Sequence, residues 1–347
     1  MSSMDAFAAG PYAYLPSNLV NTISVVDLSD TAAIPGTFTV TGTEDVTDFF
    51  GVALSRKDGL LYISDNANET VFQIDTATGT TAASYFVGTN PRGIAVEPSG
   101  RHVYVAKFSS AGLSIIDTST RQVSEVDFSP LSGLALPKPF DVALNLSGTR
   151  AYVTDSSVGH RLCRINTVAP PPSVRDGDCV EVGTDDSANP NALAVSPDGA
   201  RVYVVNHSNN NVSVVDTASL AVIRTFQLGS LSPNGIAISA SGKRGYVGTS
   251  LGIILVLDLT RVDDVGQNPV MQTITDDAIA AVQGVGISPD GTRLLAVDHD
   301  NGQLHVINIV GDANVRVASV PVNMGPFALG QFTTSDAIFV SGFQKSG

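Results

Sequence analysis

Residues 191–229 read NALAVSPDGARVYVVNHSNNNVSVVDTASLAVIRTFQLG, and their pattern decides the fold. A short apolar segment leads into a Pro-Asp-Gly turn at 197–199, and a Tyr-Val segment, a polar loop and two alternating segments follow. Proline presets φ in such a turn and glycine takes the positive φ, which is hairpin chemistry. The alternation from Val212 to Val215 is typical of a strand with one buried face. The stretch therefore predicts short antiparallel strands joined by tight turns.

The same pattern recurs along the whole chain. The residues that open its apolar segment are Gly51, Gly93, Asp141, Ala192, Gly235, Gly284 and Ala328, spaced 42 to 51 residues apart. A period of this length, with four strands per repeat, is typical of a β-propeller. We therefore predict an all-β fold, a seven-bladed β-propeller with four-stranded blades, forming one domain over residues 1–347.

The two ends of the chain complement each other. Residues 12–40 contain strand-like segments without a preceding apolar segment, and residues 325–332 (GPFALGQF) supply one at the far end. Their pairing would close the ring and remove exposed sheet edges. We therefore expect the N- and C-terminal segments to share a blade. A second late segment, AIFVSGF at 337–343, competes with residues 12–16 for one strand position, and the sequence leaves both options open.

The repeat resembles a known family. Val202-Tyr203-Val204-Val205-Asn206 followed by NVSVVD at 211–216 looks like the YVTN β-propeller repeat, and the resemblance covers essentially the whole chain. It implies the fold rather than a function, because one fold carries many activities. Members of the family include surface-layer and periplasmic proteins, an amine dehydrogenase subunit, denitrification enzymes, lactonases and an antibiotic-inactivating lyase.

Charge and composition exclude some classes of partner. The formal net charge is −14, and no run of Lys or Arg offsets it. Such a field repels phosphate backbones and anionic membrane surfaces, so we expect no nucleic-acid and no membrane partner. No stretch of 18 apolar residues is present to span a membrane. The acidic surface favours solubility, and we expect a monomer or a weak oligomer.

The two cysteines, Cys163 and Cys179, flank a blade insertion at about 163–179. Their spacing matches no metal motif. A disulfide across the insertion would indicate an oxidising compartment, extracellular or periplasmic, whereas two reduced thiols would indicate the cytoplasm. The sequence favours the disulfide.

One variable position lies just before each apolar segment. Around the ring these seven "mouth residues" are Phe327, Phe50, Arg92, Phe140, Asn191, Asn234 and Gln283. A scaffold alone does not require three aromatic residues around an arginine and three amides opposite. We predict that they bind an amphipathic small molecule, with an anionic or carbonyl group near Arg92 and an apolar body on the phenylalanines. The alternative is that the phenylalanines plug the mouth and Arg92 is solvated.

A second variable position lies three residues after the repeat tyrosine. These "strand-end residues" are Ser17, Asp65, Lys107, Asp155, Asn206, Thr249 and Asp298. Asp and Asn in this position are expected to cap turns by accepting backbone N–H groups. Lys107 breaks the pattern and shares a repeat with Arg92. It would bind a carboxylate or phosphate, or neutralise the neighbouring aspartates.

Three of the five histidines, His160, His207 and His299, fall in loops of the same predicted face; His102 and His305 fall in strands and are expected to be structural. A three-histidine metal site is the alternative role for these loops, but it is not predicted, because no HxH or HxxxH pair occurs. Nucleophile, dinucleotide and phosphate-loop motifs are also missing. The cofactor is therefore unknown.

These observations support three hypotheses. The leading one is small-molecule or partner binding at the mouth of the channel. The second is a lyase or lactone hydrolase at the same mouth, with Lys107, His207 or His299 as base or acid and Arg92 stabilising an oxyanion or enolate. The third is a surface or assembly protein without a small-molecule site. The sequence does not decide whether the protein is an enzyme.

Overall fold

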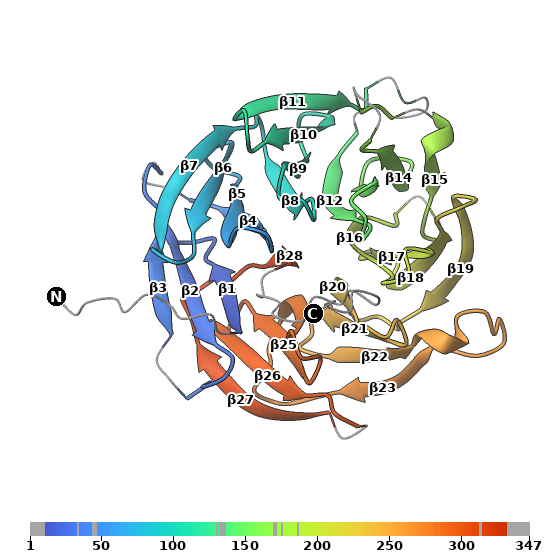
Figure 1. Ribbon diagram of the computed structural model, residues 1–347. Helices are drawn as coiled ribbons and strands as arrows, with labels where there is room; N and C mark the ends of the chain where they lie inside the picture. Colours follow the sequence, from blue (N-terminus) through green and yellow to red (C-terminus); the bar gives the residue numbers. More distant parts are fainter. Residues whose placement is uncertain are drawn as a thin grey trace, which may run out of the picture.

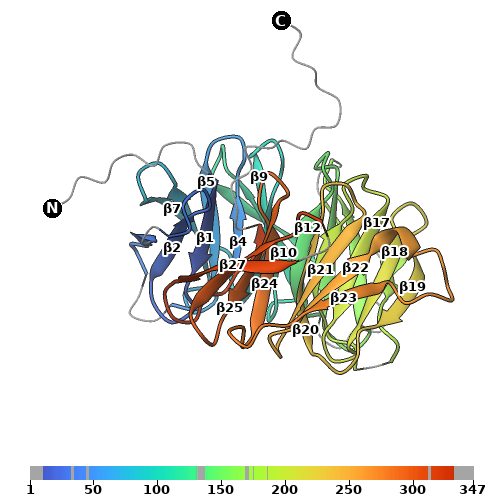
Figure 2. The ribbon, with the colours of Figure 1, turned by 90° about the horizontal axis from the view of Figure 1, so that it is seen from below.

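The computed structural model describes residues 11–32, 35–43, 47–129, 131, 137–168, 172–174, 176–185, 187–311 and 314–331. Seven antiparallel sheets stand around a central axis (Figure 1), and the ring is seen from its rim in Figure 2. The all-β, seven-bladed prediction is confirmed. Within the described ranges no helix is long and apolar enough to cross a membrane.

Each complete blade contains four strands that run outward from the axis in chain order. Blade 1 contains β1(Tyr12–Pro16), β2(Thr22–Asp27) and β3(Gly36–Thr39). Blade 2 contains β4(Phe49–Leu54), β5(Leu60–Asp65), β6(Thr70–Asp75) and β7(Thr80–Phe86). Blade 3 contains β8(Pro91–Val96), β9(His102–Lys107), β10(Gly112–Asp117) and β11(Gln122–Asp127). Blade 4 contains β12(Pro139–Leu144), β13(Arg150–Asp155), β14(Arg161–Asn166), η1(Asp176–Asp178) and β15(Cys179–Glu181).

The remaining blades repeat this arrangement. Blade 5 contains β16(Pro190–Val195), β17(Arg201–Asn206), β18(Asn211–Asp216) and β19(Ala221–Gln227). Blade 6 contains β20(Pro233–Ile238), β21(Arg244–Thr249), β22(Ile254–Asp258), η2(Leu259–Arg261) and β23(Val270–Ile274). Blade 7 contains β24(Val282–Ile287), β25(Arg293–Asp298), β26(Gln303–Asn308) and β27(Val315–Pro321), and β28(Leu329–Gln331) follows.

The C-terminal segment closes the ring, as the sequence predicts. Ser17 and Pro326 form an antiparallel bridge, and the Phe327 N–H donates to the carbonyl oxygen of Pro16 over 2.9 Å. One step further on, β28 pairs in parallel with β4 of blade 2. In blade 1, β1 takes the position beside β2 for which two segments compete in the sequence. Residues 337–343 lie outside the described part of the chain.

Apolar side chains fill the spaces between neighbouring blades. The strand residues alternate, so one sheet face packs against the preceding blade and the other against the next. One buried cluster joins Tyr14 and Val25 of blade 1 to Phe72 of blade 2 and to Leu295 and Val306 of blade 7. Further clusters lie between the other neighbouring blades, so every blade packs on both of its neighbours, the first on the last included.

The inner strands leave almost no room beside one another. A Cβ atom on Gly51 would lie 2.3 Å from the Arg92 carbonyl oxygen, and one on Gly93 would lie 2.3 Å from Asp141 Oδ1. This crowding explains why glycine or alanine opens the inner strand in six of the seven repeats. Asp141 is the exception: it is buried, and its Oδ2 accepts the N–H of Leu193 in the next blade over 3.2 Å.

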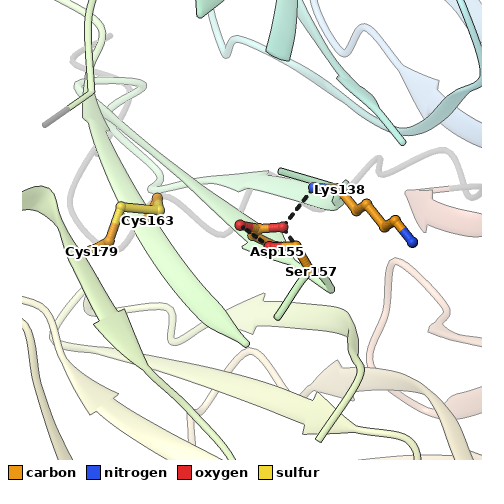
Figure 3. Close-up of a disulfide and its surroundings, with 5 residues drawn as sticks. All are labelled: Lys138, Asp155, Ser157, Cys163 and Cys179. Atoms are coloured by element: carbon orange, nitrogen blue, oxygen red, sulfur yellow. Dashed lines mark hydrogen bonds between the residues drawn. A yellow bond between two sulfur atoms is a disulfide. The ribbon is translucent and has the colours of Figure 1, made fainter. Parts of the chain in front are cut away.

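The disulfide prediction is also confirmed. Cys163 of β14 and Cys179 of β15 face each other across the sheet and are bonded, so the bridge joins the two outer strands of blade 4 (Figure 3). It encloses the insertion that separates these strands. The oxidising compartment that such a bridge would indicate stays a prediction.

Candidate site at one mouth of the ring

The three strand-end aspartates act as caps, as the sequence predicts, whereas Asn206 does not: its buried Oδ1 accepts no hydrogen bond from the described residues. Asp65 Oδ1 accepts the N–H groups of Asp48 and Ala67, and Asp155 Oδ1 accepts those of Lys138 and Ser157. Asp298 likewise accepts N–H groups from the loop before β24. Each carboxylate thus ties the loop leading into the inner strand to the hairpin between the second and third strands. These buried residues build the rim of the mouth and are occupied in doing so.

Lys107 does not belong to the mouth. Its side chain is buried, and its Nζ donates to Glu125 on the outer strand β11. Blades 2, 4 and 7 have a turn-capping aspartate at this position instead. The geometry gives no support to Lys107 as a catalytic base or as a second cation beside Arg92, because its ammonium group is already paired away from the axis.

A β-bulge marks the mouth end of the inner strand in blades 2 to 7. The pairing with the second strand shifts register at the mouth residue, for example between Phe49 and Val52 and between Pro139 and Val142. The same shift recurs in the other four blades. A bulge leaves one residue outside the ladder and re-aims its side chain. The fold therefore presents one freely variable side chain per blade at this end of the channel.

Five mouth residues line one cavity of about 200 Å³. Its lining consists of Phe140, Asn189, Asn191, His207, Asn234, Gln283 and Phe327. The three mouth residues with amide side chains, Asn191, Asn234 and Gln283, therefore lie together around one cavity, as the sequence suggests. Asn189, which the sequence analysis missed, lies in the Asn-Pro turn before β16 and has φ of 49°, a turn signal that could have pointed to it.

The side-chain amides of this cavity differ in how many of their hydrogen bonds are made. Asn234 Nδ2 donates to Ser250 Oγ and to the Val282 carbonyl oxygen, over 2.9 and 3.1 Å. Asn191 is 9% exposed, and its buried Oδ1 has no hydrogen-bond partner among the described residues. A buried acceptor left unpaired costs about 1–3 kcal/mol, so this position favours a donor from outside the protein.

The aromatic mouth residues form a continuous cluster. The ring centre of Phe50 lies 4.3 Å from that of Phe327 and 5.6 Å from that of Phe140. Phe327 in turn meets His299 edge-on at 6.3 Å. Phe50 is thus packed behind the two phenylalanines that line the cavity.

Arg92 lies across this cluster from the cavity rather than in its lining. Its Cζ is 4.8 Å from the Phe50 ring centre, 4.6 Å from Phe140 and 4.0 Å from Phe108. Its one hydrogen bond among the described residues runs from Nε to Asn90 Oδ1, over 3.3 Å. Burial lowers the pKa of the guanidinium to about 10, so it remains charged at neutral pH. Sequence analysis missed Phe108, although an aromatic residue directly after the anomalous Lys107 was a usable signal.

The three loop histidines have different surroundings. His207 lines the cavity, and its Nδ1 lies 3.0 Å from the Pro233 carbonyl oxygen. A carbonyl only accepts, so Nδ1 carries the proton and Nε2 of the neutral ring keeps its lone pair. His160 Nδ1 accepts the Asn189 N–H instead, and His299 Nδ1 contacts Asp300. In the described ranges no three His, Cys, Asp or Glu side chains are grouped to hold a metal ion.

The two predicted structural histidines each contact a carboxylate. His102 Nδ1 lies 2.7 Å from Glu97 Oε2, and His305 Nε2 lies 3.1 Å from Asp298 Oδ2. His305 and Asp298 are fully buried, and desolvation lowers the pKa of the His305 ring. Neither histidine reaches the cavity lining.

Fold and site together define a seven-bladed propeller with a small polar and aromatic cavity at one mouth. The family model described as "Lactonase, 7-bladed beta-propeller" matches residues 5–135, which span the first three blades. The "Uncharacterized protein YncE" of Salmonella typhi and that of Salmonella typhimurium are each 31% identical over 127 residues, which is 36% of this chain and 32% of theirs. The chain therefore matches about a third of the length of these curated relatives.

Solved structures share the fold at low identity. A Bacteroides fragilis protein described as a candidate 6-phosphogluconolactonase has a TM-score of 0.71 at 14% identity, over 95% of this chain and 99% of that one. The Kuenenia stuttgartiensis hydrazine synthase has a TM-score of 0.68 at 19% identity, over 83% and 91%. A functionally unknown protein of Desulfotomaculum acetoxidans gives 0.68 at 15%, over 92% and 99%. At these identities the likeness establishes the propeller architecture alone.

Proposed function

We propose that the protein binds a small organic molecule in the mouth cavity, and that the molecule has a hydroxyl or N–H group for Asn191, an apolar face for Phe140 and Phe327, and an anionic or carbonyl group toward Arg92. The observation that carries this proposal is the buried Oδ1 of Asn191, a residue that lines the cavity, because this atom has no hydrogen-bond partner among the described residues. The repeat's resemblance to the YVTN family is compatible with such a role.

The size of the cavity limits the ligand. An apolar cavity of roughly 150 Å³ is enough to hold benzene. The cavity of about 200 Å³ therefore suits one six-membered ring with a few polar substituents. Larger, drug-sized ligands occupy roughly 300 Å³ or more.

The polarity of the lining defines the ligand's hydrogen bonds. Among the described residues Asn191 Oδ1 has no partner, Asn234 uses both N–H donors and leaves its oxygen to accept, and the neutral His207 ring keeps its lone pair on Nε2. All three groups accept hydrogen bonds. A molecule rich in hydroxyl or N–H donors satisfies them, whereas a plain hydrocarbon leaves them unpaired.

A direct test compares 4-hydroxybenzoate with benzoate, which lacks the hydroxyl donor, by isothermal titration. We expect wild type to prefer 4-hydroxybenzoate and Asn191→Ala to lose that preference, because one buried hydrogen bond is worth about 1 kcal/mol, or fivefold. Gln283→Ala should weaken binding of both acids, whereas Gln122→Ala, on the exposed outer strand β11, should not.

The proposal is wrong if a panel of single-ring hydroxy acids binds no better than acetate. It is also wrong if Gln283→Ala and Gln122→Ala respond alike, or if Arg92→Ala binds these acids as wild type does.

A lactone hydrolase at the same mouth is the second candidate. The family match over residues 5–135 and the free lone pair of His207 Nε2 in the cavity favour it. In this mechanism Nε2 takes a proton from water, the water oxygen attacks the lactone carbonyl, and the ring C–O bond breaks. The imidazolium then protonates the leaving alkoxide, and a hydroxy acid results.

Hydrolysis of δ-valerolactone and gluconolactone, followed at constant pH by titration of released acid, tests this candidate. We expect His207→Gln to lower kcat at least about 100-fold, the usual contribution of a positioned general base. His299→Gln should have less effect, because its ring lies against Phe327 and Asp300 rather than in the lining. Equal rates for wild type and His207→Gln would exclude His207 as the base.

A further inference from the structure

Two cations lie beside the ring of Phe108. Arg92 Cζ is 4.0 Å from its centre, and Nζ of Lys138 is 5.5 Å from it. Phe108 follows β9, and Lys138 directly precedes β12, so the two cations come from neighbouring blades at the same mouth. In a chain of net charge −14 such a pair is unusual.

Neither cation has a carboxylate within ion-pair distance among the residues that the structure describes. Asp48 is close enough to Arg92 to favour its charged form, but its Oδ2 accepts a hydrogen bond from Asn66. Asp155 binds the main-chain N–H of Lys138, while the Lys138 side chain points away from it (Figure 3). Asp48 therefore acts on Arg92 only from beyond ion-pair distance, and both cations are left without a carboxylate in direct contact among the described residues.

The stacking of Arg92 leaves its outer donors available. A guanidinium stacked on aromatic faces contacts them through its plane, and its N–H groups point outward along its edge. Nε is bonded to Asn90, and the terminal nitrogens have no hydrogen-bond acceptor among the described residues. These terminal nitrogens form the fork that binds a carboxylate or phosphate bidentately.

We propose that Arg92 and Lys138 form an oxyanion subsite around Phe108, which holds the carboxylate or phosphate of the molecule bound at the mouth. The inference rests on the proposed function for the rest of that molecule. It assigns to Lys138 the role of second cation that the sequence suggested for Lys107. Asp155 fixes the backbone of Lys138, so the exposed side chain extends from a rigid point and can follow the anion.

Isothermal titration with inorganic phosphate, benzoate and phenyl phosphate tests the subsite. The variants are Arg92→Gln and Lys138→Gln, with Arg101→Gln and Lys57→Gln as controls that remove the same charge at exposed positions elsewhere. For phenyl phosphate we expect Kd to rise about tenfold in Arg92→Gln and about fivefold in Lys138→Gln. Both controls should stay within about twofold of wild type.

The inference is overturned if Lys138→Gln binds phenyl phosphate and benzoate as Lys57→Gln does. Lys138 is exposed, so its substitution does not threaten folding, and this comparison decides even if Arg92→Gln is unstable. If Lys138→Gln loses affinity for phenyl phosphate alone, the subsite binds a phosphate. If it loses affinity for benzoate alone, the subsite binds a carboxylate.

Inorganic phosphate separates the two proposals, since it has no body to fill the cavity. If it binds through both cations while Gln283→Ala leaves phenyl phosphate binding unchanged, the subsite stands and the proposed cavity ligand fails.

Discussion

Asp141 makes the stability of this propeller depend on pH in an unusual direction. It opens the inner strand of blade 4, where six repeats have glycine or alanine, and it is buried against the inner strand of blade 5. Burial raises the pKa of its carboxyl to about 7, although the N–H groups of Val142 and Leu193 act in the opposite direction. The folded protein therefore binds a proton here at pH values where the unfolded chain has released it.

The sign and size of the effect follow from this shift. The unfolded value is about 3.9, so the folded state binds more protons between roughly pH 4 and pH 7, and stability falls as pH rises through that window. Each pKa unit corresponds to about 1.4 kcal/mol. Between pH 5 and pH 8 the group alone should remove about 2.5 kcal/mol from the free energy of unfolding.

Urea unfolding of wild type and Asp141→Asn at pH 5 and pH 8 measures this term, with the disulfide kept intact. The asparagine loses one main-chain hydrogen bond at every pH, and that constant offset cancels when each protein is compared with itself. We expect the pH 5 to pH 8 loss to be about 2.5 kcal/mol smaller in the variant. The control Asp30→Asn, at an exposed turn, should keep the wild-type dependence. An identical pH dependence in wild type and Asp141→Asn would refute the reasoning.

Three further predictions concern the scaffold. Replacing Cys163 and Cys179 together by alanine removes a cross-link between residues that are 16 apart in sequence. It should lower the free energy of unfolding in urea titrations by about 3 kcal/mol. Reduction of the wild-type disulfide should cause the same loss. Asp298→Ala leaves one buried and two partly buried N–H groups without their acceptor, so we expect a loss of about 2–4 kcal/mol by the same measurement, whereas a loss below 0.5 kcal/mol would contradict the capping role. Lys107→Met should leave phenyl phosphate binding unchanged in titration calorimetry, and a fivefold loss would return Lys107 to the mouth.

Most of the fold could be predicted from the sequence repeat. Its spacing and turn residues predict seven blades, and the glycines of the Pro-Asp-Gly turns do adopt positive φ, 71° at Gly199 and at Gly291. Ring closure was predictable because an unpaired inner strand at one end of the chain matched a missing one at the other. The choice between residues 12–16 and residues 337–343 for the strand position beside β2 was not predictable, since both segments alternate suitably. Only packing selects Tyr12–Pro16.

The sequence predicts which positions face the mouth better than it predicts what their side chains contact. Aligning the repeats identifies the mouth residues, because blades 2 to 7 repeat the same bulge. It does not say where a long side chain ends. Lys107 occupies a column that faces the rim in other blades, yet its ammonium group reaches Glu125 on an outer strand. Lys138 lies in the loop before β12, outside either aligned column, and only the structure brings it beside Phe108.

The distribution of unsatisfied groups argues that the mouth is more than the end of a packed ring. Five buried side-chain atoms among the described residues lack a hydrogen-bond partner, and of these only Asn191 Oδ1 belongs to a residue that lines the cavity. The strand-end aspartates beside it accept two or more hydrogen bonds each. Across the phenylalanines, Arg92 keeps its charge without an ion pair to any residue that the structure describes. A donor group for Asn191 and an anion for Arg92 would complete this arrangement, and the small amphipathic molecule that we propose as the ligand would have to supply both.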